Sequence, residues 1–82
     1  MGLKKLAAKL AEYNERLERG AASKIEAEHV QQVLEKLRRK EASLLAEVIQ
    51  AEDELARARL ERKLGIARDQ IARAQWLLGE IS

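Results

Sequence analysis

Apolar side chains recur along this sequence at alternating intervals of three and four residues, the spacing that places them on one face of an α-helix. In the first segment the series consists of Leu3, Leu6, Leu10, Tyr13 and Leu17. It predicts a helix over about residues 3–19 that packs against a neighbour along one seam. Arg19 followed by Gly20 predicts where this helix ends, because glycine is preferred just after a helix C-terminus.

The composition favours the same fold class. Alanine, glutamate, lysine, leucine and arginine make up about two thirds of the 82 residues, a proportion typical of coiled coils and long helices. The chain has no proline, cysteine or phenylalanine, which argues against sheet folds, disulfide scaffolds and thiolate zinc sites. We therefore predict an all-α protein in which residues 1–82 form a single helical domain.

The start of a second helix is indicated by the sequence Ser23-Lys-Ile-Glu26. A serine followed three residues later by glutamate has the spacing of a capping box, with Ser23 as the N-cap and Glu26 at the third helical position. This predicts a helix that begins at about residue 24. The short loop before it would fold the helix back on the first one.

The direction of the apolar stripe divides the rest of the chain into two helices. At about 100° per residue, the stripe of residues 30–55 points roughly 140° away from the stripe of residues 60–81. A turn at about residues 50–56 removes this conflict, with Asp53 as the candidate N-cap of the next helix. The alternative is a continuous rod that changes its packing partner at mid-length.

With the turn, we expect a three-helix arrangement with coiled-coil-like packing: a long antiparallel hairpin of about residues 24–50 and 54–81, plus the shorter N-terminal helix. In the last segment Ala67 and Ala74 are seven residues apart on the apolar stripe. Small side chains at this spacing let two helix backbones approach closely. They therefore predict a tight pairing surface within the hairpin.

Several large apolar residues lie off these stripes: Ile25, Leu45, Ile49, Ile66, Trp76 and Leu77. The first helix would cover some of them, or a second copy of the chain would. Trp76 also shares an outer stripe of the last helix with several arginines, and Trp and Arg are enriched at interaction hot spots. The predicted interaction surface comprises Trp76, Arg73, Ile66, Arg62, Arg59 and Ile49. We expect a non-catalytic assembly module that forms a homodimer or higher oligomer, with another protein as a further candidate partner.

A nucleic-acid-binding regulator is the alternative function. Its candidate residues, all on the last predicted helix, are Arg57, Arg59, Arg62, Lys63 and Arg73. The formal net charge of the chain is only +2, which is too balanced to indicate a polyanionic partner by itself. Segments 1–22 and 57–82 are net basic and segment 23–56 is net acidic, a distribution that favours attraction between helices of the fold.

A metal-binding bundle is the third hypothesis. Glu26 and His29 have the Glu-x-x-His spacing that di-iron bundles use. A complete site would need a further carboxylate from the first helix, for which Glu12, Glu15 and Glu18 are the candidates. The spacing is weak evidence in a glutamate-rich chain, so we expect no metal and no other cofactor.

The sequence offers no constellation for catalysis. It has no cysteine or threonine, one histidine and dispersed glycines, and hence neither a nucleophile arrangement nor a phosphate-binding loop. We expect no enzymatic activity. No apolar run reaches the length of a transmembrane span, and no signal-peptide pattern is present, so the expected location is the cytoplasm.

Overall fold

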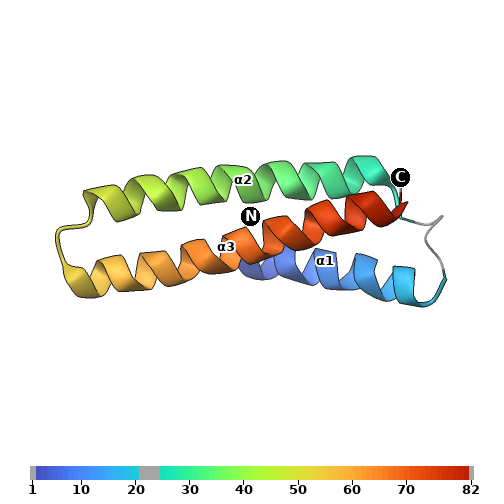
Figure 1. Ribbon diagram of the computed structural model, residues 1–82, viewed down its shortest axis with the longest axis horizontal. Helices are drawn as coiled ribbons and strands as arrows, with labels where there is room; N and C mark the ends of the chain where they lie inside the picture. Colours follow the sequence, from blue (N-terminus) through green and yellow to red (C-terminus); the bar gives the residue numbers. More distant parts are fainter. Residues whose placement is uncertain (1, 21–24, 82) are drawn as a thin grey trace.

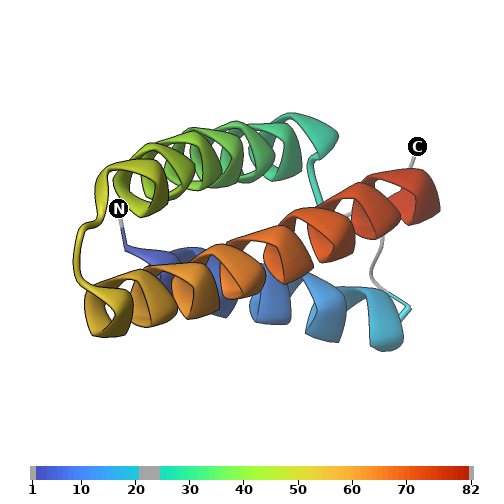
Figure 2. The ribbon, with the colours of Figure 1, turned by 60° about the vertical axis from the view of Figure 1, so that its left-hand side comes forward.

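The protein folds into three α-helices in the computed structural model, which describes residues 2–20 and 25–81. The helices are α1 (Leu3–Glu18), α2 (Ala27–Gln50) and α3 (Glu54–Ile81). Figures 1 and 2 show α2 and α3 as a long antiparallel hairpin, with α1 packed along one side of it. This confirms the predicted all-α, three-helix arrangement and excludes the continuous rod.

The shorter α1 does not cover the whole hairpin. The molecule is 47 Å long, whereas a 16-residue helix such as α1 spans about 24 Å at 1.5 Å per residue. Figure 1 shows that α1 lies beside the first half of α2 and the last half of α3. The half of the hairpin that contains the α2–α3 turn therefore extends beyond α1.

The α2–α3 turn consists of residues 51–53, within the predicted range. The backbone N–H of Leu55 donates to Asp53 Oδ1 at 3.2 Å, which confirms Asp53 as the N-cap of α3. Arg57 Nη2 donates to the carbonyl of Ala51 at 2.9 Å. A side-chain cap and a cross-turn hydrogen bond thus hold a turn that contains neither glycine nor proline.

The end of α1 also follows the sequence prediction. Arg19 occupies the C-cap position, and Gly20 follows with a φ of +74°. The N–H of Gly20 donates to the carbonyl of Leu17 at 3.0 Å, as expected for a glycine that terminates a helix.

The start of α2 differs from the prediction. The helix begins at Ala27, and Glu26 occupies the N-cap position with an extended backbone and no side-chain capping bond, so Glu26 is not the third helical residue. Ser23 lies outside the described residues. The later start accompanies the burial of Ile25, which is 5% exposed. Burial of such a side chain is worth about 1.5–3 kcal/mol, more than the ~1 kcal/mol typical of a cap.

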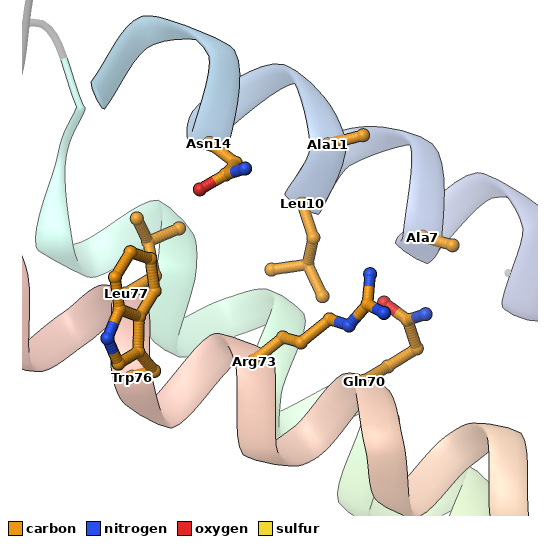
Figure 3. A pocket seen from close by; sticks show the side chains of 8 residues that line it. All are labelled: Ala7, Leu10, Ala11, Asn14, Gln70, Arg73, Trp76 and Leu77. Carbon is orange, nitrogen blue, oxygen red and sulfur yellow. The ribbon is translucent and has the colours of Figure 1, made fainter. Parts of the chain in front are cut away.

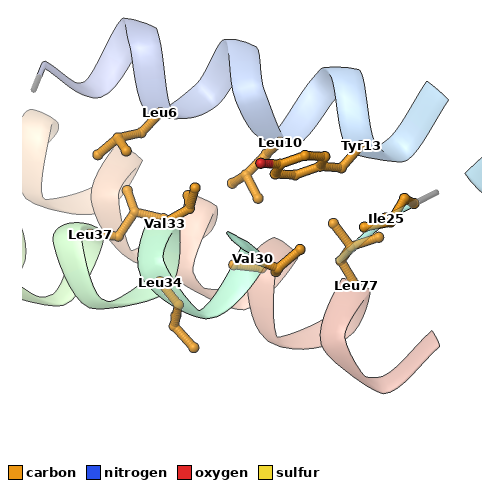
Figure 4. Packing of buried hydrophobic residues seen from close by; sticks show 10 residues of the cluster. Leu6, Leu10, Tyr13, Ile25, Val30, Val33, Leu34, Leu37 and Leu77 are labelled. Atoms are coloured by element: carbon orange, nitrogen blue, oxygen red, sulfur yellow. The ribbon is translucent and has the colours of Figure 1, made fainter. Parts of the chain in front are cut away.

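The main core lies where all three helices meet (Figure 4). From α1 it contains the centre of the predicted seam, Leu6, Leu10 and Tyr13, while Leu3 and Leu17 at the seam ends are partly buried. The other buried members are Ile25, Val30, Val33, Leu34, Leu37, Ala74 and Leu77. Ile25 and Leu77, which lie off the predicted stripes, are therefore covered within one chain.

A smaller cluster lies beyond this core, toward the turn. Its buried members are Leu44, Leu64 and Ala67, with Leu3 and Leu60 packed against them. Ala67 and Ala74 are fully buried, which confirms the alanine-spaced pairing surface of α3. The turn half of the hairpin thus has a thinner core than the half that α1 covers.

Electrostatic contacts between the helices are sparse. Arg68 Nε and Glu41 Oε2 are 3.1 Å apart and join α3 to α2, whereas the other ion pairs among the described residues lie within a helix or at its ends. Packing of apolar side chains therefore dominates the arrangement. None of the helices in the described part of the chain has the length and apolar character needed to cross a membrane.

Candidate interaction surface

Large apolar side chains remain exposed on α2 and α3. Among the described residues they are Leu45 (41% exposed), Ile49 (74%), Leu55 (62%), Ile66 (47%) and Trp76 (54%). The exposure of Leu55 was not expected. Its position on the apolar stripe of residues 30–55 predicts that it is buried, and this prediction is wrong. It lies in the first turn of α3, in the half of the hairpin that α1 does not cover.

The structure brings most of the predicted interaction residues onto one surface. Arg59, Arg62, Ile66, Arg73 and Trp76 are all exposed on α3. Their alternating spacing of three and four residues places them along one side of α3. Ile49 does not join them, because it lies near the C-terminal end of α2. The candidate surface is therefore the outer face of α3.

A groove between α1 and α3 adjoins this surface. Arg73 and Trp76 line it from α3, and Ala7 and Ala11 line it from α1 (Figure 3). Its volume is about 520 Å³, and Leu10, Asn14, Gln70 and Leu77 complete the lining. This groove is not predictable from the sequence, because its existence depends on which side of α3 packs against α1. The one available signal was the pair of small residues four positions apart on α1.

One charge pair lies within the surface. Arg73 Nε is 3.2 Å from Asp69 Oδ2, one helical turn away, and both side chains are more than half exposed. An exposed pair of this kind contributes only a few tenths of a kcal/mol to stability. It nevertheless orients the Arg73 side chain along the outer face of α3.

The five residues of the nucleic-acid hypothesis are all exposed on α3, but they differ in their contacts. The Arg57 guanidinium donates to the backbone of the α2–α3 turn, and Arg73 pairs with Asp69. Within the described residues, Arg59, Arg62 and Lys63 form no ion pair. These three are the cations that remain available to a phosphate backbone.

The predicted metal ligands are close together but do not form a cluster. His29 Nε2 lies 3.2 Å from Glu26 Oε2, and both side chains are more than half exposed. No group of three or more His, Cys, Asp or Glu side chains gathers at one place in the described part of the chain. Lys9 and Lys36 line the same depression as His29, and their charge disfavours a metal cation there.

The candidate third carboxylates have other contacts or stand apart. Glu12 pairs with Arg16 at 2.8 Å and Glu15 with Arg19 at 2.6 Å. Glu18, the last residue of α1, is exposed. The structure therefore brings none of the three into a cluster with Glu26 and His29.

Comparisons with protein-family models, with curated proteins and with solved structures found no match for this chain. The fold and the exposed outer face of α3 are therefore the observations on which a function is proposed.

Proposed function

We propose that this chain is a non-catalytic protein–protein assembly module that acts as a homo-oligomeric helical bundle. The observation that carries the proposal is the exposure of Ile66 and Trp76 beside Arg62 and Arg73 on the outer face of α3. An aromatic residue and arginines around an apolar neighbour are typical of the energetic centre of a protein interface.

The size of the chain supports this proposal. Small domains bury a limited fraction of their surface and gain stability from association. Here α1 covers only half of the hairpin (Figure 1), and Leu45, Ile49 and Leu55 remain exposed in addition to the α3 face. Full burial of one such side chain is worth about 1.5–3 kcal/mol. Association that buries several of them would therefore add substantially to the stability of a protein with a small core.

Light scattering behind a sizing column tests the proposal. A monomer has a mass of 9.3 kDa, and we expect a multiple of this mass that persists on dilution into the micromolar range. Trp76→Ala should shift the distribution toward the monomer. Gln75→Ala, an exposed position beside it on α3, serves as the control and should not. A mass of 9.3 kDa at every concentration would reject the proposal.

Nucleic-acid binding is a second candidate, favoured by Arg59, Arg62 and Lys63 on α3, which form no ion pair with the residues that the structure describes. Because counterion release drives phosphate binding, the affinity should fall steeply as the salt concentration rises. A titration of duplex DNA and of RNA at about 50 mM salt, the low end of that regime, tests this function. Absence of binding to both would remove it.

A further inference from the structure

The outer face of α3 carries a charge pattern with a particular symmetry. At alternating intervals of four and three residues it presents Arg62, Ile66, Asp69, Arg73, Trp76 and Glu80. All six side chains are exposed. The stripe is about 27 Å long at 1.5 Å per residue. Its order of side chains is cation, apolar, anion, cation, apolar, anion.

The stripe is complementary in charge to a second copy of itself that runs in the opposite direction. When two copies are aligned in opposite directions about residue 71, Arg62 faces Glu80 of the second copy. In the same alignment Asp69 faces Arg73, and Ile66 faces Trp76. Because the alignment is symmetric, every facing pair occurs twice. All the charged pairs are of opposite sign, and the apolar pairs lie between them.

We propose that two copies of this chain pair through the outer faces of their α3 helices, antiparallel, about a two-fold axis that passes beside residue 71. This arrangement rests on the proposed function, to which it adds the partner and the register. A two-fold interface uses the same patch on both subunits and must complement itself, as this stripe does.

The ion pair between Arg73 and Asp69 within each chain positions both side chains for the contact at the centre of the interface. Arg73 contacts Asp69 of its own chain through Nε. A guanidinium also has N–H donors on its two Nη atoms, which can reach Asp69 of the second copy. Two arginines and two aspartates would then form an alternating network at the centre of the interface.

The apolar contacts flank this network. Trp76, which is 54% exposed, and Ile66, which is 47% exposed, lose this exposure by packing on each other across the axis. Ala7 and Ala11 line the α1 side of the groove, across from Gln70 and Arg73 (Figure 3). Their small side chains leave room for a second helix to approach α3 from this side.

Two other alignments of the same stripe bring like charges together. A parallel pair in register places Arg62, Asp69, Arg73 and Glu80 each opposite its own copy. An antiparallel pair shifted by one heptad places Glu80 against Asp69 in one direction and Arg62 against Arg73 in the other. Like charges that face each other across an interface are destabilising. A parallel pair staggered by one heptad joins opposite charges, but it places Ile66 against Arg73 and Trp76 against Asp69 and is not two-fold symmetric. The proposed register is therefore the one of these that satisfies both the charges and the apolar side chains.

Disulfide trapping tests the register, because the chain contains no cysteine. Asp69→Cys and Arg73→Cys are prepared as separate proteins and oxidised singly and as a mixture. Facing residues of an antiparallel pair lie within the ~7 Å between Cα atoms that a disulfide tolerates. The mixture should give a covalent dimer of one copy of each variant, at a yield at least several-fold above that of either protein alone.

The second test is charge reversal, measured as the dissociation constant of the dimer. Arg62→Glu should raise the constant about tenfold or more, because it places two glutamates opposite each other at both ends of the interface. Glu80→Lys should have a similar effect. The double variant Arg62→Glu/Glu80→Lys should restore the constant of the unchanged protein. Failure of the double variant to do so would overturn the register.

The outcomes separate the two proposals. Covalent dimers from Asp69→Cys alone would indicate parallel pairing or another register and would overturn this inference. A stable wild-type oligomer without the mixed disulfide would also overturn it, while the proposed assembly function would stand. A wild-type monomer at all concentrations would overturn both.

Discussion

Leu37 lies in the main core with no exposed surface, whereas Leu55 on the following helix is 62% exposed. Substitution of both by alanine compares the same chemical change at two levels of burial. We expect Leu37→Ala to lower the free energy of unfolding by about 2–5 kcal/mol through lost burial and the cavity left behind. Leu55→Ala should change it by less than about 1 kcal/mol. Urea denaturation measures the difference, at a protein concentration where both variants have the same oligomeric state. Equal losses of unfolding free energy would contradict the described core.

The effect of Asp53 on stability comes from one carboxylate oxygen. Its Oδ1 accepts the N–H of Leu55, so Asp53→Ala should cost about 1 kcal/mol of stability. Asparagine retains a side-chain oxygen at this position, and Asp53→Asn should remain close to the unchanged protein. Thermal denaturation followed by circular dichroism compares the two variants. A similar loss in both would mean that the charge rather than the capping bond matters.

At the scale of helices and their connections, one substitution should have opposite effects at two glycines. Gly20 has a φ of +74°, which a side chain makes unfavourable, so Gly20→Ala should destabilise the protein by about 1 kcal/mol. Gly65 lies within α3, and an added Cβ there meets nothing within 4 Å. Gly65→Ala should therefore stabilise it by about 0.5–1 kcal/mol. Denaturation curves of the two variants give the signs, and a stabilising Gly20→Ala would contradict the αL end of α1.

The element boundaries that could be predicted are those set by periodicity and by single residues. The heptad spacing from Leu3 to Leu17 defined α1, and the change of stripe direction placed the turn correctly although it lacks glycine and proline. The start of α2 was predicted about three residues too early. A local capping pattern cannot reveal that Ile25 is buried before the helix begins, because that burial depends on contacts with distant parts of the chain.

For the whole molecule, the uneven coverage by α1 predicts uneven protection against hydrogen exchange. Residues near Leu34 and Leu37 lie in a core to which three helices contribute, whereas those near Leu44 and Leu64 lie in a smaller cluster. Local opening requires less free energy where fewer apolar contacts are broken. Exchange measured by mass spectrometry on Trp76→Ala, the variant expected to favour the monomer, should therefore be faster in the helical residues 44–50 and 54–60 than in residues 30–37. Uniform protection along the hairpin would contradict this difference.

Only part of the candidate surface could be predicted from the sequence. The stripe that contains Trp76, Arg73 and Ile66 could be found because residues on one helix face share a period. Two other features could not be found. The burial of Leu77 beside an exposed Trp76 is one of them, and the groove between α1 and α3 is the other. Both depend on where α1 packs against α3, which the period of a single helix does not determine.

The two connections of this bundle should tolerate sequence drift very differently. None of the residues 51–53 has a positive φ, and Asp53 provides the cap, so Ala51 and Glu52 can be exchanged for many other residues at little cost. The end of α1 instead depends on the backbone of Gly20. Over evolutionary time we expect the α2–α3 connection to vary in composition while retaining an Asp, Asn, Ser or Thr at one position. The position of Gly20, just after the C-terminal end of α1, should remain glycine or change to asparagine.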